Sequence, residues 1–249
     1  MTTVKKERHS LPEPALAGGG SGVELLDYDA VPGRRTVGSA PGNMLLIHGF
    51  GGDKGQLRPL GDALCPTGSV AVYPSLRAHG DSHRPAWGYS VLDFSADLHR
   101  FADALPDDLH LVGYSYGGLV AAISAVTWGA AKVRSLVLID QSFDAHPALH
   151  VADEWVEGSL LRWTYDFGHL PDLLERLDIP VLVLAAADSR NIPADERERL
   201  SHRDGKALAV ETIRGSHADC YRNTDQIASA MRDFYSGQFP GTDEKENAA

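Results

Sequence analysis

The sequence predicts an α/β protein in which a doubly wound, mostly parallel sheet carries helices on both faces. The short and fully apolar run 44–47 is typical of a central strand covered on both sides, and 133–139 also reads as a strand. Segments such as 91–105 carry apolar residues three and four positions apart, which predicts amphipathic helices. The two kinds of segment alternate along the chain, as they do when helices connect parallel strands.

Length, charge and cysteine content limit the number of domains and the classes of partner that this chain can have. The 249 residues suffice for one α/β domain with a large core. A formal net charge of −11 argues against nucleic acid and anionic membranes as partners. Cys65 and Cys220 lie far apart and give neither a disulfide framework nor a metal-binding pattern, so we expect no metal and no cofactor. The polar N-terminus lacks a signal-peptide pattern, and no apolar run is long enough to span a membrane, so we expect a cytoplasmic protein.

The first half of the chain predicts alternating strands and helices behind a disordered arm at 1–22, whose sequence is charged and then rich in glycine. A first strand is expected at 23–30, with a turn at 31–33 and a strand at 35–38 that pairs back on it. The elements expected next are a strand at 44–47, a helix at 56–64, a strand at 70–73, a helix at 91–105 with Leu92 facing inward, a strand at 109–112, a helix at 119–128 and a strand at 133–139.

The second half contains an interruption of this alternation. Residues 141–178 look helical and hold several aromatic residues but no strand, so we expect a short helical lid inserted after the sixth strand. The elements expected after the lid are a strand at 180–185, a helix at 196–200, a strand at 207–213 and a helix at 224–235. The folded domain is thus predicted to span 23–236, followed by a flexible tail at 237–249.

A glycine-rich turn at 113–117 (GYSYG) is the strongest local signal, because it joins a predicted strand to a predicted helix. This G-x-S-x-G pattern is typical of a nucleophile elbow, a sharp turn that presents a serine above the sheet edge. Glycines are needed there because side chains would collide with the neighbouring strand and helix. Ser115 is therefore the predicted nucleophile, in preference to a serine that merely caps the helix.

A serine nucleophile needs a base, and a histidine base needs a carboxylate to orient it. Among eleven histidines, His217 is the candidate because it follows the last predicted strand on a Gly-Ser-His loop. Two aspartates follow strands between the serine and the histidine, in the order that such triads allow. We favour Asp188 as the acid and keep Asp140 as the alternative, since either strand end is close enough to His217.

The tetrahedral intermediate of acyl transfer needs two hydrogen-bond donors for its oxyanion. The backbone N–H of Tyr116, directly after the nucleophile, is one candidate. The other is Phe50 in the glycine-rich loop 48–52 (HGFGG) that follows the strand 44–47.

With these motifs, together with the RAHGDS loop at 77–82, the chain resembles the α/β-hydrolase family over most of its length. The resemblance implies a serine hydrolase with an acyl-enzyme intermediate, and it places the insert 141–178 where the family has its cap. A serine at the nucleophile position excludes the epoxide-hydrolase and dehalogenase branches, which need a carboxylate there. The residues expected to line the substrate site are His48, Tyr114, Trp155, Trp163 and Phe167.

Three functions remain open on the sequence. The favoured one is hydrolysis of a small or medium carboxylic ester. The runner-up is a thioesterase that releases an acyl group from coenzyme A or a carrier protein. A ligand-sensing receptor on the same fold is the non-enzyme alternative, because fold alone does not fix function. The expected partner is a small acyl substrate, with an acyl carrier as the alternative, and the chain is expected to be a monomer or homodimer.

Overall fold

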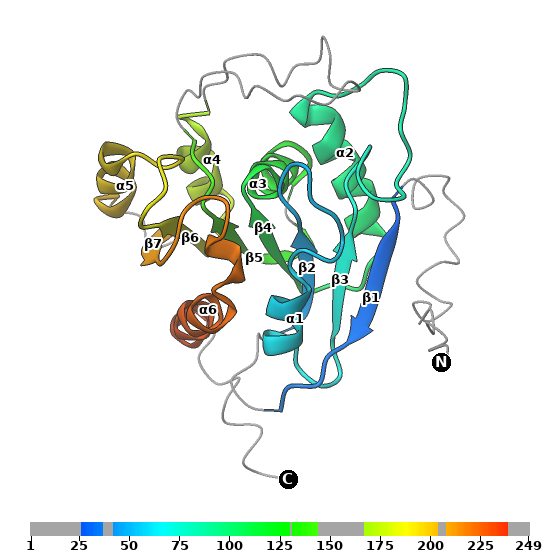
Figure 1. The fold of residues 1–249 in the computed structure, drawn as a ribbon, viewed down its shortest axis with the longest axis horizontal. Coiled ribbons are helices and arrows are strands. Elements are labelled where there is room, and N and C mark those ends of the chain that lie inside the picture. The colour runs from blue at the N-terminus through cyan, green and yellow to red at the C-terminus, as the bar shows by residue number, and fades with distance from the viewer. Residues whose placement is uncertain (1–25, 37–41, 130, 144–166, 204–207, 239–249) are drawn as a thin grey trace.

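The predicted fold class is confirmed by a computed structural model, which describes residues 26–36, 42–129, 131–143, 167–203 and 208–238. Its centre is a seven-stranded sheet with the order β1-β3-β2-β4-β5-β6-β7, and helices lie on both sides of it (Figure 1). All neighbouring strands are parallel except β1 and β3. The strands are β1 (Tyr28–Pro32), β2 (Asn43–Ile47), β3 (Val70–Pro74), β4 (Leu109–Tyr114), β5 (Val133–Ile139), β6 (Val181–Ala186) and β7 (Leu208–Ile213).

The N-terminal edge of the sheet differs from the prediction. Strand β1 includes Val31 and Pro32, which were expected to form a turn, and all five of its residues pair with β3. In the segment 35–38, which was expected to pair back on the first strand, Arg35 instead makes a single bridge to Pro66, and residues 37–41 lie outside the described parts. β1 is an edge strand, and the backbone groups on its inner side pair with β3.

Side chains of the central strands alternate between two apolar cores, one on each face of the sheet. On β2, Leu45 and Ile47 point into one core, and Met44 and Leu46 into the other. The first core is covered by α2 (Val91–Asp103), α3 (Tyr116–Trp128) and α4 (Leu170–Arg176), with α5 (Ala194–Ser201) near its β7 end. The second is covered by α1 (Arg58–Leu64) and α6 (Thr224–Gln238). Burial on both faces explains why these strands are largely apolar.

Helix α2 begins where its sequence predicts. Ser90 caps it in a capping box, in which the Ser90 side chain accepts from the Asp93 N–H and the Asp93 carboxylate accepts from the Ser90 N–H. Phe94, Leu98 and Phe101 are fully buried in the first core. Leu92 was expected to face inward as well, but it is 54% exposed. It lies outside the buried face because the period of the helix places that face at 94, 98 and 101.

Several predicted segments lie partly or wholly outside the described residues. The arm 1–22 and most of the proposed lid belong here, since 1–25 and 144–166 are not described, so both stay predictions. The predicted tail begins too early, because α6 continues through Gln238. Among the described residues, the helices are all too short or too polar to cross a membrane. The cytoplasmic location stays a prediction.

Candidate active site

The predicted catalytic residues gather at the carboxyl edge of the parallel strands, where open α/β sheets bind their ligands. Ser115 directly follows β4 and Asp140 directly follows β5. His217 lies four residues beyond the end of β7, and His48 directly follows β2. Residues that follow four separate strands therefore lie at the same edge of the sheet, where the parallel topology places them.

The Ser115 turn has the strained geometry that its glycines suggest. Ser115 has φ 50° and ψ −126°, a backbone conformation that side chains other than glycine rarely adopt. A Cβ at Gly113 would stand 2.5 Å from the Gly118 backbone, and one at Gly117 would stand 2.3 Å from the His48 carbonyl oxygen. The turn is therefore possible only because both flanking positions lack a side chain.

Ser115, His217 and Asp140 form a continuous chain of hydrogen bonds. Ser115 Oγ lies 2.9 Å from His217 Nε2, and His217 Nδ1 lies 2.7 Å from Asp140 Oδ2. Because Nδ1 faces a carboxylate, it carries the proton, and Nε2 accepts from the serine hydroxyl. The Asp140 side chain has no exposed surface, whereas the His217 side chain is 39% exposed. The imidazole is thus held from its buried side and open to solvent on the other.

Asp140 is fixed by the strands on both sides of it. The parallel register pairs Tyr114 with Ile139, so Ser115 and Asp140 leave the sheet at the same level, and the Ser115 N–H donates to the Ile139 carbonyl at 2.8 Å. On the other side, the Ala186 N–H donates to Asp140 Oδ1 at 2.9 Å. One carboxylate oxygen is therefore anchored on β6, and the other is left for His217.

The preference for Asp188 as the partner of His217 is wrong, because the structure places Asp140 there. Asp188 is exposed, and its backbone N–H donates to the Gly215 carbonyl at 3.0 Å. Asp188 thus supports the histidine loop through its main chain rather than its carboxylate. The order of residues along the chain allows both aspartates, and it is the adjacency of β5 and β4 that favours Asp140.

The segment beyond Asp140 is clamped by a buried carboxylate that the sequence did not single out. Glu196, on α5, is 1% exposed. Its Oε2 accepts from the Ser142 hydroxyl at 2.6 Å, and its Oε1 accepts from the Phe143 N–H at 2.6 Å. Nothing in the charged run of α5 distinguishes Glu196 from its exposed neighbours, apart from a spacing of four residues to buried Leu200.

Tyr114 was expected to line the substrate site, but it supports the His217 loop instead. It is 5% exposed, and its hydroxyl donates to the His217 carbonyl oxygen. Its ring also packs against His217 and Tyr221. Burial raises the pKa of the Tyr114 hydroxyl, so it remains a donor at neutral pH. Its position on β4, one residue before Ser115, explains why it faces the second core.

His48 was also expected at the substrate site, and it too is buried, at 1% exposure. Its Nε2 accepts from the Leu76 N–H at 2.8 Å, and its Nδ1–H donates to the Gly49 carbonyl at 2.7 Å. Burial lowers the His48 pKa to about 4, so the ring is neutral near pH 7. Both ring nitrogens thus bind backbone, and His48 ties the loop after β2 to the loop after β3.

The two predicted oxyanion donors lie next to each other. Tyr116 is the first residue of α3, and Phe50 lies in the loop after β2. Their ring centroids are 6.0 Å apart with an edge-to-face geometry. Their role as donors stays a prediction.

The remaining predicted substrate residues come from the insert. Trp155 and Trp163 lie outside the described residues. Phe167 is half-buried, packs against the first core, and donates its N–H to the Phe143 carbonyl at 2.9 Å. Phe167 thus lies beside the segment that Glu196 holds.

Comparison with known proteins identifies the family. A family model described as the alpha/beta hydrolase fold matches residues 42–175, which are more than half of the chain. The chain therefore belongs to this family, as its motifs suggested.

Two curated relatives match part of the chain. Pimeloyl-[acyl-carrier protein] methyl ester esterase of Pseudoalteromonas atlantica is 32% identical over 125 residues, which are 49% of this chain and 43% of that protein. Lipase 3 of a Moraxella species is 33% identical over 104 residues, which are 39% of this chain and 31% of that protein. The chain spans less than half the length of either relative.

Solved structures match over a longer range. An esterase from Thermogutta terrifontis has a TM-score of 0.68 at 18% identity, covering 85% of this chain and 93% of that one. The thioesterase domain from the curacin biosynthetic pathway has a TM-score of 0.64 at 17% identity, covering 83% and 94%. At these identities the likeness concerns the fold alone.

Proposed function

We propose that this protein is a serine hydrolase that cleaves a small or medium carboxylic ester through Ser115, His217 and Asp140. The observation that carries the proposal is the hydrogen-bonded chain from Ser115 Oγ through the His217 ring to Asp140. Nucleophilic catalysis by a serine requires a base within hydrogen-bond reach and a carboxylate that orients the base. His217 and Asp140 have these positions relative to Ser115.

The reaction begins when His217 Nε2 takes the proton of the Ser115 hydroxyl as Oγ attacks the ester carbonyl. The N–H groups of Tyr116 and Phe50 receive the negative charge that develops on the carbonyl oxygen. His217 then gives its proton to the departing alcohol, which leaves an acyl group on Ser115. A water molecule, deprotonated by the same ring, releases the acid. Asp140 stabilises the imidazolium in both halves of the cycle and keeps the ring in the productive tautomer.

A thioester is the second candidate substrate, because the same steps release a thiol in place of an alcohol. The relative from Pseudoalteromonas is named for an ester borne on an acyl-carrier protein, and the curacin domain is named as a thioesterase. Both names support an acyl group attached to a carrier as the alternative substrate, with the carrier as the partner. The acyl specificity is expected from the aromatic insert, to which Phe167 belongs.

The test is turnover of matched oxygen and sulfur esters. Wild-type protein and the Ser115→Ala variant are incubated with p-nitrophenyl esters of two to twelve carbons and with acyl-coenzyme A thioesters of the same acyl groups. We expect the wild type to favour oxygen esters and the variant to lose turnover by about 10⁴-fold or more. A preference for thioesters would replace the first candidate with the second. No turnover by the wild type of any substrate would contradict both and favour the receptor alternative.

A further inference from the structure

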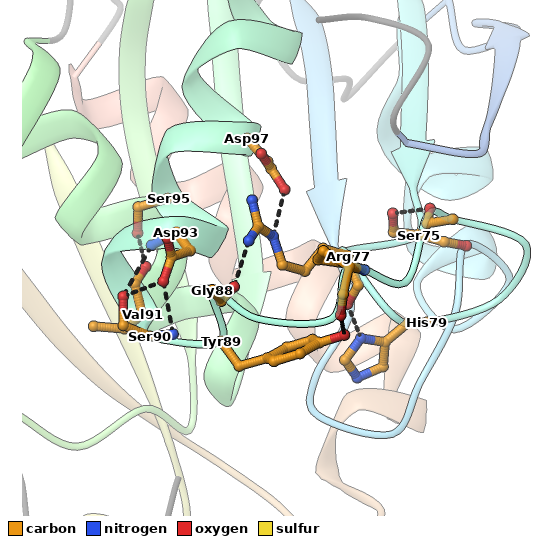
Figure 2. A network of polar contacts seen from close by, with 12 residues as sticks. Ser75, Arg77, His79, Gly88, Tyr89, Ser90, Val91, Asp93, Ser95 and Asp97 are labelled. Atoms are coloured by element: carbon orange, nitrogen blue, oxygen red, sulfur yellow. Dashed lines mark hydrogen bonds and ion pairs between the residues drawn. The ribbon is translucent and has the colours of Figure 1, made fainter. Parts of the chain in front are cut away.

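We propose that His79 is a positioning residue for the oxyanion donor Phe50, and that the Arg77–Asp97 ion pair supports it from α2. The proposal rests on the proposed function, because it assigns Phe50 N–H to the oxyanion. Figure 2 shows His79 next to Arg77, with Arg77 reaching across to Asp97 on the helix.

The first step is the contact between His79 and the loop 48–52. His79 lies in the loop after β3 and is 4% exposed. Its Nε2 accepts from the Gly51 N–H at 3.0 Å, so Nδ1 carries the ring proton and donates to the Arg77 carbonyl at 2.9 Å. The ring therefore joins the residue after Phe50 to the main chain at Arg77.

The second step follows from the planarity of peptides, which fixes an N–H direction once the opposite carbonyl is fixed. Phe50 N–H belongs to the same peptide as the Gly49 carbonyl, and that carbonyl accepts from His48 Nδ1–H at 2.7 Å and from Gly52 N–H at 3.0 Å. The next peptide, from Phe50 to Gly51, is held through its N–H by His79. The two peptides flanking Phe50 are thus each held by one buried histidine.

The third step concerns the Phe50 side chain. Its ring contacts His79 edge to face at a centroid distance of 5.4 Å, and it contacts Tyr116 in the same manner at 6.0 Å. His79 therefore touches both the main chain and the side chain on either side of the proposed donor. Gly51, at φ 73°, has a backbone conformation that other residues rarely adopt, and the hydrogen bond from its N–H to His79 holds the chain at this turn.

The support behind His79 is an ion pair buried under the loop. Arg77 Nε donates to Asp97 Oδ2 at 2.7 Å, and the side chains are 11% and 2% exposed. A terminal nitrogen of Arg77 also donates to the Gly88 carbonyl (Figure 2). Asp97 lies on α2, whose apolar face is buried in the core. The carbonyl that accepts the hydrogen bond from His79 thus belongs to a residue whose side chain is bound to helix α2.

Two amide variants of His79 separate positioning from simple packing. In His79→Asn, the side chain reaches the Arg77 carbonyl but is too short for Gly51 N–H. In His79→Gln, one more methylene lets Oε1 take the place of Nε2. We measure kcat and KM on p-nitrophenyl butyrate, and the Ki of an alkyl trifluoromethyl ketone, which forms a tetrahedral adduct with the serine. His99→Asn on α2, away from the loop, is the matched control.

We expect His79→Asn to lower kcat about 10- to 100-fold, to change KM less than about threefold, and to raise the ketone Ki by the same factor as kcat falls. His79→Gln should recover kcat to within about fivefold of the wild type, and His99→Asn should match the wild type. Unchanged kcat and Ki in His79→Asn would overturn the proposal, as would an equal loss in His79→Asn and His79→Gln.

Failure of this inference differs from failure of the proposed function. An active wild type and an inactive Ser115→Ala variant, together with a fully active His79→Asn variant, would overturn the role of His79 alone. A wild type that neither hydrolyses the ester nor binds the ketone would overturn the proposed function, and with it the oxyanion that His79 serves.

Discussion

His217 Nδ1 lies 2.7 Å from Asp140 Oδ2, and the carboxylate that accepts this hydrogen bond has no exposed surface. Its second oxygen accepts from the Ala186 N–H on the neighbouring strand β6. A hydrogen bond to a carboxylate held in this way fixes the orientation of the imidazole and keeps the proton on Nδ1. The proposed mechanism depends on this pair more than on any other contact outside Ser115.

Asp140→Asn should therefore lower kcat by about 10⁴-fold, because an amide at this position favours the wrong tautomer of His217. Asp188→Asn is the matched control, since it removes an exposed carboxylate at the end of the next strand. We expect its kcat to stay within about threefold of the wild type, measured on p-nitrophenyl butyrate at pH 8. A larger loss of kcat in Asp188→Asn than in Asp140→Asn would show that Asp188, the residue favoured by the sequence, is the catalytic acid.

The turn at Ser115 should not tolerate a methyl group at Gly113. A Cβ there would stand 2.5 Å from the Gly118 backbone, so the start of α3 must move in Gly113→Ala. We expect kcat to fall more than about 100-fold, since a displacement near 1 Å is enough for such a loss.

Gly129→Ala, at the other end of α3, is the control. Its φ of 90° costs about 1–2 kcal/mol of stability, but no atom lies within 4 Å of the added methyl. Its kcat should therefore be unchanged, and equal activity of the two variants would argue against this account of the turn.

Glu196 should matter for both stability and activity. In Glu196→Gln, one of the two acceptor oxygens becomes a donor, so the bond to Ser142 or to Phe143 is lost. We expect the free energy of unfolding to fall by about 1–3 kcal/mol, and kcat to fall about tenfold because the segment after Asp140 loosens. Urea denaturation and steady-state kinetics measure the two effects, with exposed Glu198→Gln as the control on the same helix. A Glu196→Gln variant as stable and active as Glu198→Gln would contradict the claim that Glu196 holds the segment after Asp140.

Buried neutral histidines should make stability depend on pH. Burial lowers the pKa of His110 to about 4, as it does for His48, whereas an unfolded histidine has a pKa near 6.5. Between these values the unfolded chain binds more protons, so the free energy of unfolding falls as the pH is lowered through this window. The loss is about 2 kcal/mol per histidine between pH 7 and pH 5. Denaturation of the wild type and His110→Asn at these two pH values tests this, and the variant should lose less. An equal loss in both would contradict a neutral His110.

The sequence predicts most of the sheet because the central strands are short and largely apolar segments. Residues 44–47 and 135–139 are buried, as expected for strands covered on both faces. The edge strand β1 was misplaced by several residues, since it is half-buried and its pattern is weak. Its pairing depends on the register with β3, which is a long-range contact that local sequence does not encode.

The contact between Ser115 and His217 was predictable, because the glycine turn and the position after the last strand are both local signals. The carboxylate that contacts His217 was not, since strand order decides which carboxylate reaches it and both aspartates follow strands. Tyr114 and His48 were expected to line the substrate site. Their side chains turn out to hold backbone carbonyls and N–H groups, and the sequence gives no indication of such contacts.

The measurement that most directly tests the central claim is the position of a covalent adduct. The protein is treated with a fluorophosphonate, digested, and its peptides are mapped by mass spectrometry. We predict a single adduct on Ser115, formed far more slowly in Asp140→Asn and absent from Ser115→Ala. An adduct on another residue would contradict the assignment of Ser115 as the activated nucleophile. So would a folded wild-type protein that forms no adduct.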